Sequence, residues 1–275
     1  MVDKLFAPSH LSAFLDLLLK EALKTPYLMD ELLAFAAAHK STICNDGQLY
    51  QVEATRLQTR ALNQFNIGQM EVTEQNCMAV FTFSALLGQH SLFDAFSAMT
   101  DLSTVLDKLT HCISLHRGIR AIAGESWERI HSLLQEQAFI DLAHMAVDIP
   151  TTSGIECDGL LQRLQSADIS QRTIAHYEQA VKILQYLFDS SKASESRRLT
   201  ACQEFLVRVS ADYISLLERR QPEALVIISY YGVLLHQAKD YWTIGDSGRF
   251  LINAVSGHLG TYWAEWLAWP NEALE

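Results

Sequence analysis

The sequence lacks any two cysteines spaced closely enough for a metal or redox motif. Its five cysteines lie far apart, in apolar surroundings, and their number is odd: Cys44, Cys77, Cys112, Cys157 and Cys202. This distribution favours reduced, buried thiols. The sequence also has no Asn-x-Ser/Thr acceptor and no basic-then-apolar signal at Met1–Phe6. We therefore expect an intracellular protein.

Positive charge is scarce in this sequence. It has 21 Lys and Arg residues against 32 Asp and Glu residues, which gives a formal net charge of −11. A domain that grips the phosphates of DNA normally carries the opposite sign. We therefore expect no direct nucleic-acid binding by this chain.

Long hydrophobic runs and strand patterns are also missing. The longest uncharged run, Gln75–Phe93, contains Gln, Asn, Gly and His, so it predicts a core helix and no membrane span. No stretch alternates with a period of two for long enough to indicate a strand. The sequence has no fixed-period repeat, so we do not expect a solenoid.

Apolar residues at three- and four-residue spacing are abundant, and they make up 49% of the sequence, enough for a large core. The pattern predicts an all-α fold, with one large domain over residues 1–275 and about ten or more helices. The predicted helices are one capped by Ser9, Pro26 to about His39, Leu49–Phe65, one capped by Thr73, Ser103–Ile122 capped by Asp101, Ser126–Met145, Ser170–Ser190, Leu199–Val209, and Asp212–Arg220 capped by Ser210. Turn formers predict a break at Pro150–Gly159 and a polar connector at Ser190–Ser196.

The stretch Pro222–Pro270 organises the rest of the chain. Pro222 suits the first turn of a helix, and Ala224–Ala238 has no formal charge except on His236, so this helix is predicted to be buried on nearly every side. A glycine turn and a second apolar helix, Phe250–Leu259, follow. Trp263, Trp266 and Trp269 close the segment. Two buried helices joined by a glycine turn and sealed by aromatic rings could form the wall of an apolar cavity.

The sequence contains no convincing catalytic or metal-binding motif. Gly245-Asp246-Ser247-Gly248 spells the GDSG of trypsin-like proteases, but helices are predicted on both sides and Arg249 follows, so we interpret it as a turn with Asp246 or Ser247 as helix cap. Cys112 and His116 share a helix face, but no HxxxH or HExxH accompanies them. No acid–base pair or glycine-rich phosphate loop is evident. We expect no enzyme, no metal and no cofactor.

The C-terminal segment carries a distinctive series of residues: Pro222-Glu223-Ala224-Leu225, Tyr230–His236, Trp242, Gly245, Gly248, Trp263, Trp266-Leu267 and Trp269-Pro270. In this order and spacing they resemble the regulatory domain of fungal zinc-cluster transcription factors, and most closely that of the sterol uptake control factors. The resemblance extends more loosely back to Tyr50. The zinc-cluster cysteines, basic linker and dimerisation helix of that family are missing, which indicates a regulatory-domain fragment or a homologue without the DNA-binding part.

The resemblance implies a hydrophobic pocket for ergosterol or a related sterol. Sterol occupancy would repress the factor, and depletion would release it from the cytoplasm to the nucleus to activate genes of sterol synthesis and uptake. The implied ligand-binding residues are Phe81, Phe83, Leu86, Leu87, Ile227, Tyr230, Tyr231, Leu234, Trp242, Gly245, Gly248, Phe250 and Leu251.

The Trp242–Gly248 turn is the candidate moving part, because glycines permit backbone changes that other residues resist. Gly248 is expected to need either a positive φ or a close approach to a wall of the pocket. The alternative function is that of a helical module for protein interaction or dimerisation that binds no ligand. In that case the apolar stretches form the core or a homodimer interface.

Overall fold

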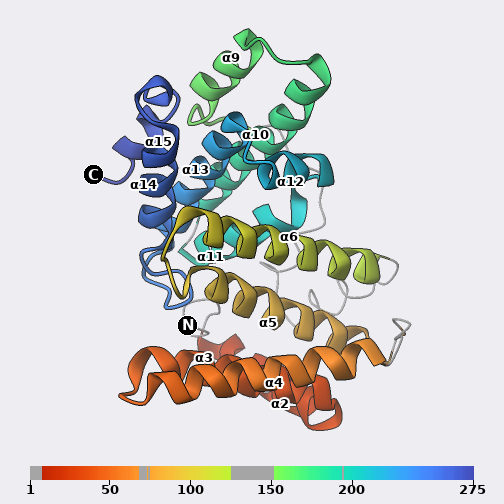
Figure 1. Ribbon diagram of the computed structural model, residues 1–275. Coiled ribbons are helices and arrows are strands. Elements are labelled where there is room, and N and C mark those ends of the chain that lie inside the picture. The colour runs from red at the N-terminus through yellow and green to blue at the C-terminus, as the bar shows by residue number, and fades with distance from the viewer. Residues whose placement is uncertain (1–7, 68–72, 74, 125–151, 194) are drawn as a thin grey trace. The chain divides into compact units, whose positions relative to one another are not determined.

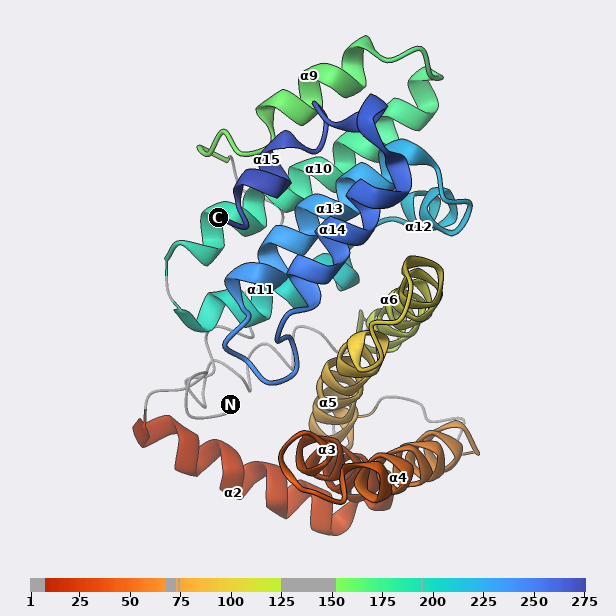
Figure 2. The same cartoon turned by 60° about the vertical axis from the view of Figure 1, so that its left-hand side comes forward.

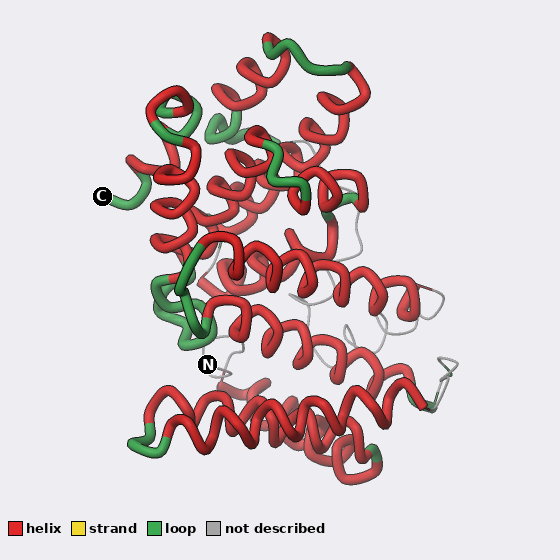
Figure 3. Tube along the Cα trace, viewed as in Figure 1, coloured by secondary structure: helices red, strands yellow, loops and turns green. Residues whose placement is uncertain are grey.

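A computed structural model describes residues 8–67, 73, 75–124, 152–193 and 195–275 of the chain. Every regular element in these residues is a helix, and none is a strand (Figure 3). The all-α prediction is therefore confirmed. The predicted helix Ser126–Met145 lies outside the described residues, as does the beginning of the Pro150–Gly159 break.

Twelve α-helices and one short 3-10 helix are described (Figure 1). They are α2 (Pro8–Lys24), α3 (Pro26–Ile43), α4 (Gly47–Ile67), α5 (Cys77–Phe96), α6 (Leu102–Gly124), α9 (Asp158–Ser166), α10 (Gln171–Ser191), α11 (Glu195–Arg208), α12 (Ala211–Glu218), α13 (Pro222–Gln237), α14 (Ser247–Leu259), η2 (Thr261–Trp263) and α15 (Ala268–Glu272).

The contacts group the chain into two compact units. The first comprises residues 1–91 and 115–146, and the second comprises residues 92–114 and 147–275. Helices α5 and α6 each contribute to both units. The assignment of residues 1–275 to one regulatory domain stays a prediction.

The first unit is built on a hairpin of α3 and α4, which lie side by side, with α2 packed on α3 (Figure 1). Its core gathers small and aromatic side chains from α2 to α5: Leu18, Ala22, Tyr27, Leu28, Ala61, Ala79, Phe83 and Leu87. The small side chains Ala22 and Ala61 let the helices approach closely, and the rings fill the space that remains. This unit also buries a polar contact, in which His90 Nδ1 lies 3.0 Å from Glu31 Oε1.

The second unit is arranged around α13. This helix packs against α10, α11, α12, α14 and α15 (Figure 2). Every residue from Ala224 to Leu235 is buried, as the uncharged run predicts. Pro222 lies in its first turn, where a missing N–H costs nothing.

The polar residues predicted as caps begin most of their helices as expected. The Thr104 N–H donates to Asp101 Oδ1 at 2.9 Å, and the hydroxyls of Ser170 and Ser210 accept from backbone N–H groups at the starts of α10 and α12. Thr25 and Pro26 separate α2 from α3. Two caps are wrong, because α2 already includes Ser9 and α5 begins only at Cys77, after Thr73.

Three other boundaries differ from the sequence prediction. Helix α11 begins at Glu195, inside the predicted polar connector, because its charged first turn hides the apolar period. Helix α14 begins at Ser247 and not at Phe250. Helix α9 begins at Asp158, inside the predicted break. Charged or small residues fill these first turns, and apolar periodicity does not detect them.

The five cysteines are free thiols, and all except Cys44 are buried. This agrees with the expected reduced state. Among the helices that the structure describes, none combines the length and apolar character that a bilayer crossing requires.

Candidate functional site

The candidate ligand-binding residues occur in both units. Phe81, Phe83, Leu86 and Leu87 lie on the part of α5 that belongs to the first unit, and the other nine lie on α13, the following turn and α14. Because the placement of the two units is not fixed, each group is described by itself. The assignment of these thirteen residues to one ligand site stays a prediction.

In the first unit, Phe83 belongs to a cluster of three rings. It stacks on Phe65 with 4.8 Å between ring centroids, and Tyr27 meets both rings edge-on. The Tyr27 hydroxyl is buried and has no hydrogen-bond partner among the described residues. Burial, with a smaller effect from Glu21, raises the pKa of Tyr27 to about 12, so the phenol stays protonated. Leu87 is buried beside this cluster, whereas Phe81 and Leu86 are half-buried.

In the second unit, Tyr231 is held in the contact between α13 and α11. Its hydroxyl donates to the Cys202 carbonyl oxygen at 3.0 Å, and its ring stacks on Phe205 with 4.6 Å between centroids. The Cys202 sulfur lies 3.2 Å from the Arg198 carbonyl oxygen and 3.5 Å from the Leu234 carbonyl oxygen, and its single proton can be donated to either. Burial raises the pKa of both Tyr231 and Cys202, which keeps each group neutral. Tyr231 is thus anchored by polar and ring contacts within the protein.

Tyr230 lies on another side of α13. Its ring stacks on Trp269 with 5.0 Å between centroids, and Trp269 meets Phe188 edge-on. This stack fixes α15 on α13 and α10. All three tryptophans are half-buried: Trp269 packs on Tyr230 and Phe188, whereas Trp263 and Trp266 pack on each other at 5.2 Å between ring centroids.

Gly248 marks the closest approach of α14 to α13. A Cβ added there would lie 2.3 Å from the His236 backbone nitrogen and 2.4 Å from the Gly232 carbonyl oxygen. Gly232 faces the same contact, since its Cβ would lie 2.8 Å from Ile252. Position 248 is expected to require glycine for either a positive φ or a close approach to another surface. The structure shows a close approach, and the surface is the α13 backbone. The positive φ, +51°, falls on Gly245 instead.

The turn between α13 and α14 is folded on itself. The N–H groups of Ile244 and Gly245 donate to the Tyr241 carbonyl oxygen, and the Ser247 N–H donates to the Ile244 carbonyl oxygen. Asp246 occupies the N-cap position of α14, but its side chain makes no cap hydrogen bond. The turn interpretation of the GDSG sequence holds for Gly245 and Asp246, whereas Ser247 and Gly248 already belong to α14.

Aromatic packing also fixes this turn. Trp242 packs on Phe93 with 5.1 Å between ring centroids. Beyond the turn, Leu251 is buried and Phe250 is half-buried, and Ile227 is buried on α13. Sequence reasoning missed Phe93, since only folding brings the end of α5 to this turn. It also missed Thr243, a buried hydroxyl for which the sequence offers no signal.

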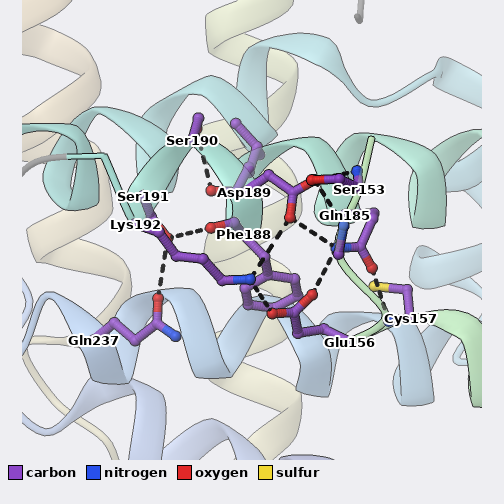
Figure 4. Close-up of polar contacts among 12 residues, drawn as sticks. Ser153, Glu156, Cys157, Gln185, Phe188, Asp189, Ser190, Ser191, Lys192 and Gln237 are labelled. Carbon is purple, nitrogen blue, oxygen red and sulfur yellow. Dashed lines mark hydrogen bonds and ion pairs between the residues drawn. The ribbon is translucent and has the colours of Figure 1, made fainter. Parts of the chain in front are cut away.

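A second polar site fastens the loop before α9 to α10. The N–H groups of Ser153 and Gly154 both donate to Asp189 Oδ2, at 2.9 and 3.1 Å. The Cys157 N–H donates to Gln185 Oε1 at 2.9 Å. Figure 4 shows Lys192 reaching across to both Glu156 and Asp189. The loop is therefore held by charge-assisted hydrogen bonds.

We expect Asp189→Ala to release this loop. The substitution removes the acceptor of two backbone N–H groups, and hydrogen bonds to charged groups contribute about 1.5–3 kcal/mol. Limited proteolysis should therefore cut near Ser153 faster in the variant. Glu178→Ala, on the same helix, removes one exposed hydrogen bond to Gln165 and is the control. Equal cleavage rates in wild type and Asp189→Ala would contradict the assigned role.

Comparison with known proteins gives one informative similarity. The chain is 23% identical over 263 residues to a protein of Gibberella zeae described as a Zn(2)-C6 fungal-type transcription factor. The alignment covers 89% of this chain and 52% of that protein, so the chain spans about half the length of the relative it matches. No family model matches the chain, and no solved structure matches it. The chain is thus similar to part of a fungal zinc-cluster transcription factor.

Proposed function

We propose that this chain is a sterol-sensing regulatory domain of a fungal zinc-cluster transcription factor. Similarity across 89% of the chain supports the transcriptional role. The choice of a sterol as the ligand rests on the resemblance of the α13–α14 segment to sterol uptake control factors. Ergosterol or a related sterol would bind among apolar side chains, and occupancy would repress transcription. The domain would have no catalytic activity of its own, and the whole factor would act in the nucleus.

The observation that carries the proposal is the burial of α13 and its turn. A rigid, flat sterol needs apolar walls and one or two polar groups for its hydroxyl. Helix α13 presents no charged side chain from Ala224 to Leu235, and Trp242 and Phe93 provide an aromatic surface beside it. For regulation, the sterol must bind one conformation of the domain more tightly than another.

A titration tests the proposal. A fluorescent sterol, displaced by ergosterol, should saturate the folded protein at a site without charged residues. Circular dichroism at the same concentration would verify the helical fold. Absence of saturation by protein that is still helical would sink the sterol assignment.

One observation favours the alternative, a helical interaction module. Leu15, Leu19 and Leu23 recur on one face of α2, and Leu23 remains 77% exposed. Such a stripe is typical of a helix that packs against a partner. If the titration shows no binding and the protein forms a homodimer in analytical ultracentrifugation, this alternative takes precedence.

A further inference from the structure

Where α13 joins α14, three buried polar atoms have no hydrogen-bond partner among the described residues: one in the last turn of α13, one in the connecting turn and one at the start of α14. They are His236 Nδ1, Thr243 Oγ1 and Ser247 Oγ. Thr243 is 2% exposed and Ser247 is fully buried. Buried polar groups are nearly always paired, and an unpaired one costs about 1–3 kcal/mol. Three such atoms at one helix junction point to a polar group that is missing from the described structure, such as one on a bound ligand.

The backbone brings these residues to one place. Gly248 lies against the His236 backbone where α14 contacts α13, and Ser247 is its neighbour in the chain. Thr243 belongs to the same folded turn, in which the Ser247 N–H donates to the Ile244 carbonyl oxygen at 3.2 Å. The three residues therefore belong to the joined ends of α13 and α14, two helices that run side by side in Figure 2.

The chemistry of the three atoms matches a hydroxyl group. A hydroxyl has one proton to donate and two lone pairs to accept. The Thr243 and Ser247 hydroxyls can each donate to it, and His236 Nδ1 can accept from it when Nε2 carries the ring proton. Burial lowers the pKa of His236, and Lys239 and Arg249 lower it further, so the ring is neutral at neutral pH. A neutral ring leaves that acceptor in place.

The surroundings favour a ligand that is otherwise apolar. Tyr241 and Ile244 are buried in the turn, and the Trp242 ring packs on Phe93 beside it. A charged ligand would need a buried counter-ion, and none of the three unpaired side chains carries a charge at neutral pH. One hydroxyl on an apolar body fits both the polar atoms and their neighbours.

We propose that this turn binds the single hydroxyl group of an apolar ligand, with Thr243, Ser247 and His236 as its hydrogen-bond partners. The inference rests on the proposed function, because a sterol carries one hydroxyl at the end of a rigid apolar body. It adds the orientation of the ligand, whose hydroxyl lies at the α13–α14 turn.

The test compares ergosterol with its 3-deoxy analogue as competitors of a fluorescent sterol on the full chain. Wild type should prefer ergosterol by about tenfold, the effect of roughly one buried hydrogen bond. The double substitution Thr243→Val and Ser247→Ala should reduce this preference to about twofold or less and leave affinity for the deoxy sterol unchanged. Ser256→Ala, on α14 but hydrogen-bonded to Asn271, is the control and should keep the preference.

The outcomes separate the two proposals. Wild-type protein that is folded and binds neither sterol overturns the proposed function and this inference together. Binding with a tenfold hydroxyl preference that survives in the double variant overturns only the position of the hydroxyl. If the double variant melts early, the single substitutions are measured in its place, and each should lose part of the preference.

Discussion

Alanine at position 248 is expected to destabilise the protein by about 3 kcal/mol, because its Cβ has no space between α13 and α14. The atoms it would meet, His236 N at 2.3 Å and Gly232 O at 2.4 Å, belong to the backbone of another helix. Backbone cannot rotate away as a flexible side chain can. The two helices would have to separate, and the small gain in helix propensity from alanine would not offset that.

Gly257→Ala is the matched control on the same helix. Nothing lies within 4 Å of a Cβ at Gly257, and the residue is exposed in α14. We expect this variant to gain about 0.5–1 kcal/mol from helix propensity alone. Chemical denaturation of both variants is the measurement. If Gly248→Ala is as stable as Gly257→Ala, α14 does not approach α13 as described.

The same substitution should also weaken sterol binding, because the turn that follows α13 is positioned by this contact. Gly248→Asp should have the larger effect, since it adds a carboxylate against buried backbone. Loss of affinity in a variant that keeps its helical circular dichroism would support a turn that controls the site. Loss of affinity together with loss of helix would show only that the glycine is structural.

The second large effect is expected at Glu204, the centre of a buried ion triad. Its carboxylate is fully buried and accepts from Arg197 Nη2 at 3.2 Å and from Arg208 Nε at 2.6 Å. Both arginine side chains are themselves less than 10% exposed. Glu204→Gln removes the negative charge that both of these buried guanidinium groups contact. Breaking such a group typically costs about 3–5 kcal/mol.

The exposed pair of Glu265 with Arg163 provides the control. Glu265 is 80% exposed, and surface ion pairs contribute about 0–1 kcal/mol. Thermal unfolding should therefore place the melting temperature of Glu204→Gln roughly 6 to 15 °C below that of Glu265→Gln. Similar melting temperatures for the two variants would mean that the triad is hydrated or does not form.

Much of the helical framework could be predicted from sequence, because local chemistry determines it. Ser170, Ser210 and Asp101 each offer a side-chain oxygen directly before an apolar period, and each caps its helix as expected. The uncharged run after Pro222 likewise predicts the burial of α13. Boundaries were missed where the first turn is charged, as at Glu195.

The candidate site was less predictable, because its partners come from distant parts of the chain. Sequence patterns place Trp242 near a turn but cannot show that Phe93 packs on it. Nor can they distinguish a glycine that needs a positive φ, Gly245, from one that needs space, Gly248. Sequence patterns also cannot show that Tyr231, a predicted ligand contact, donates a hydrogen bond to the Cys202 carbonyl oxygen.

The most direct test of the central claim is to identify what the protein carries when purified from fungal cells. Lipid extraction followed by mass spectrometry should recover a sterol, at close to one molecule per chain, from wild type and from Gly257→Ala. The Gly248→Asp variant should yield much less. A folded wild-type protein that carries no sterol, and that takes none up from added ergosterol, would contradict the account.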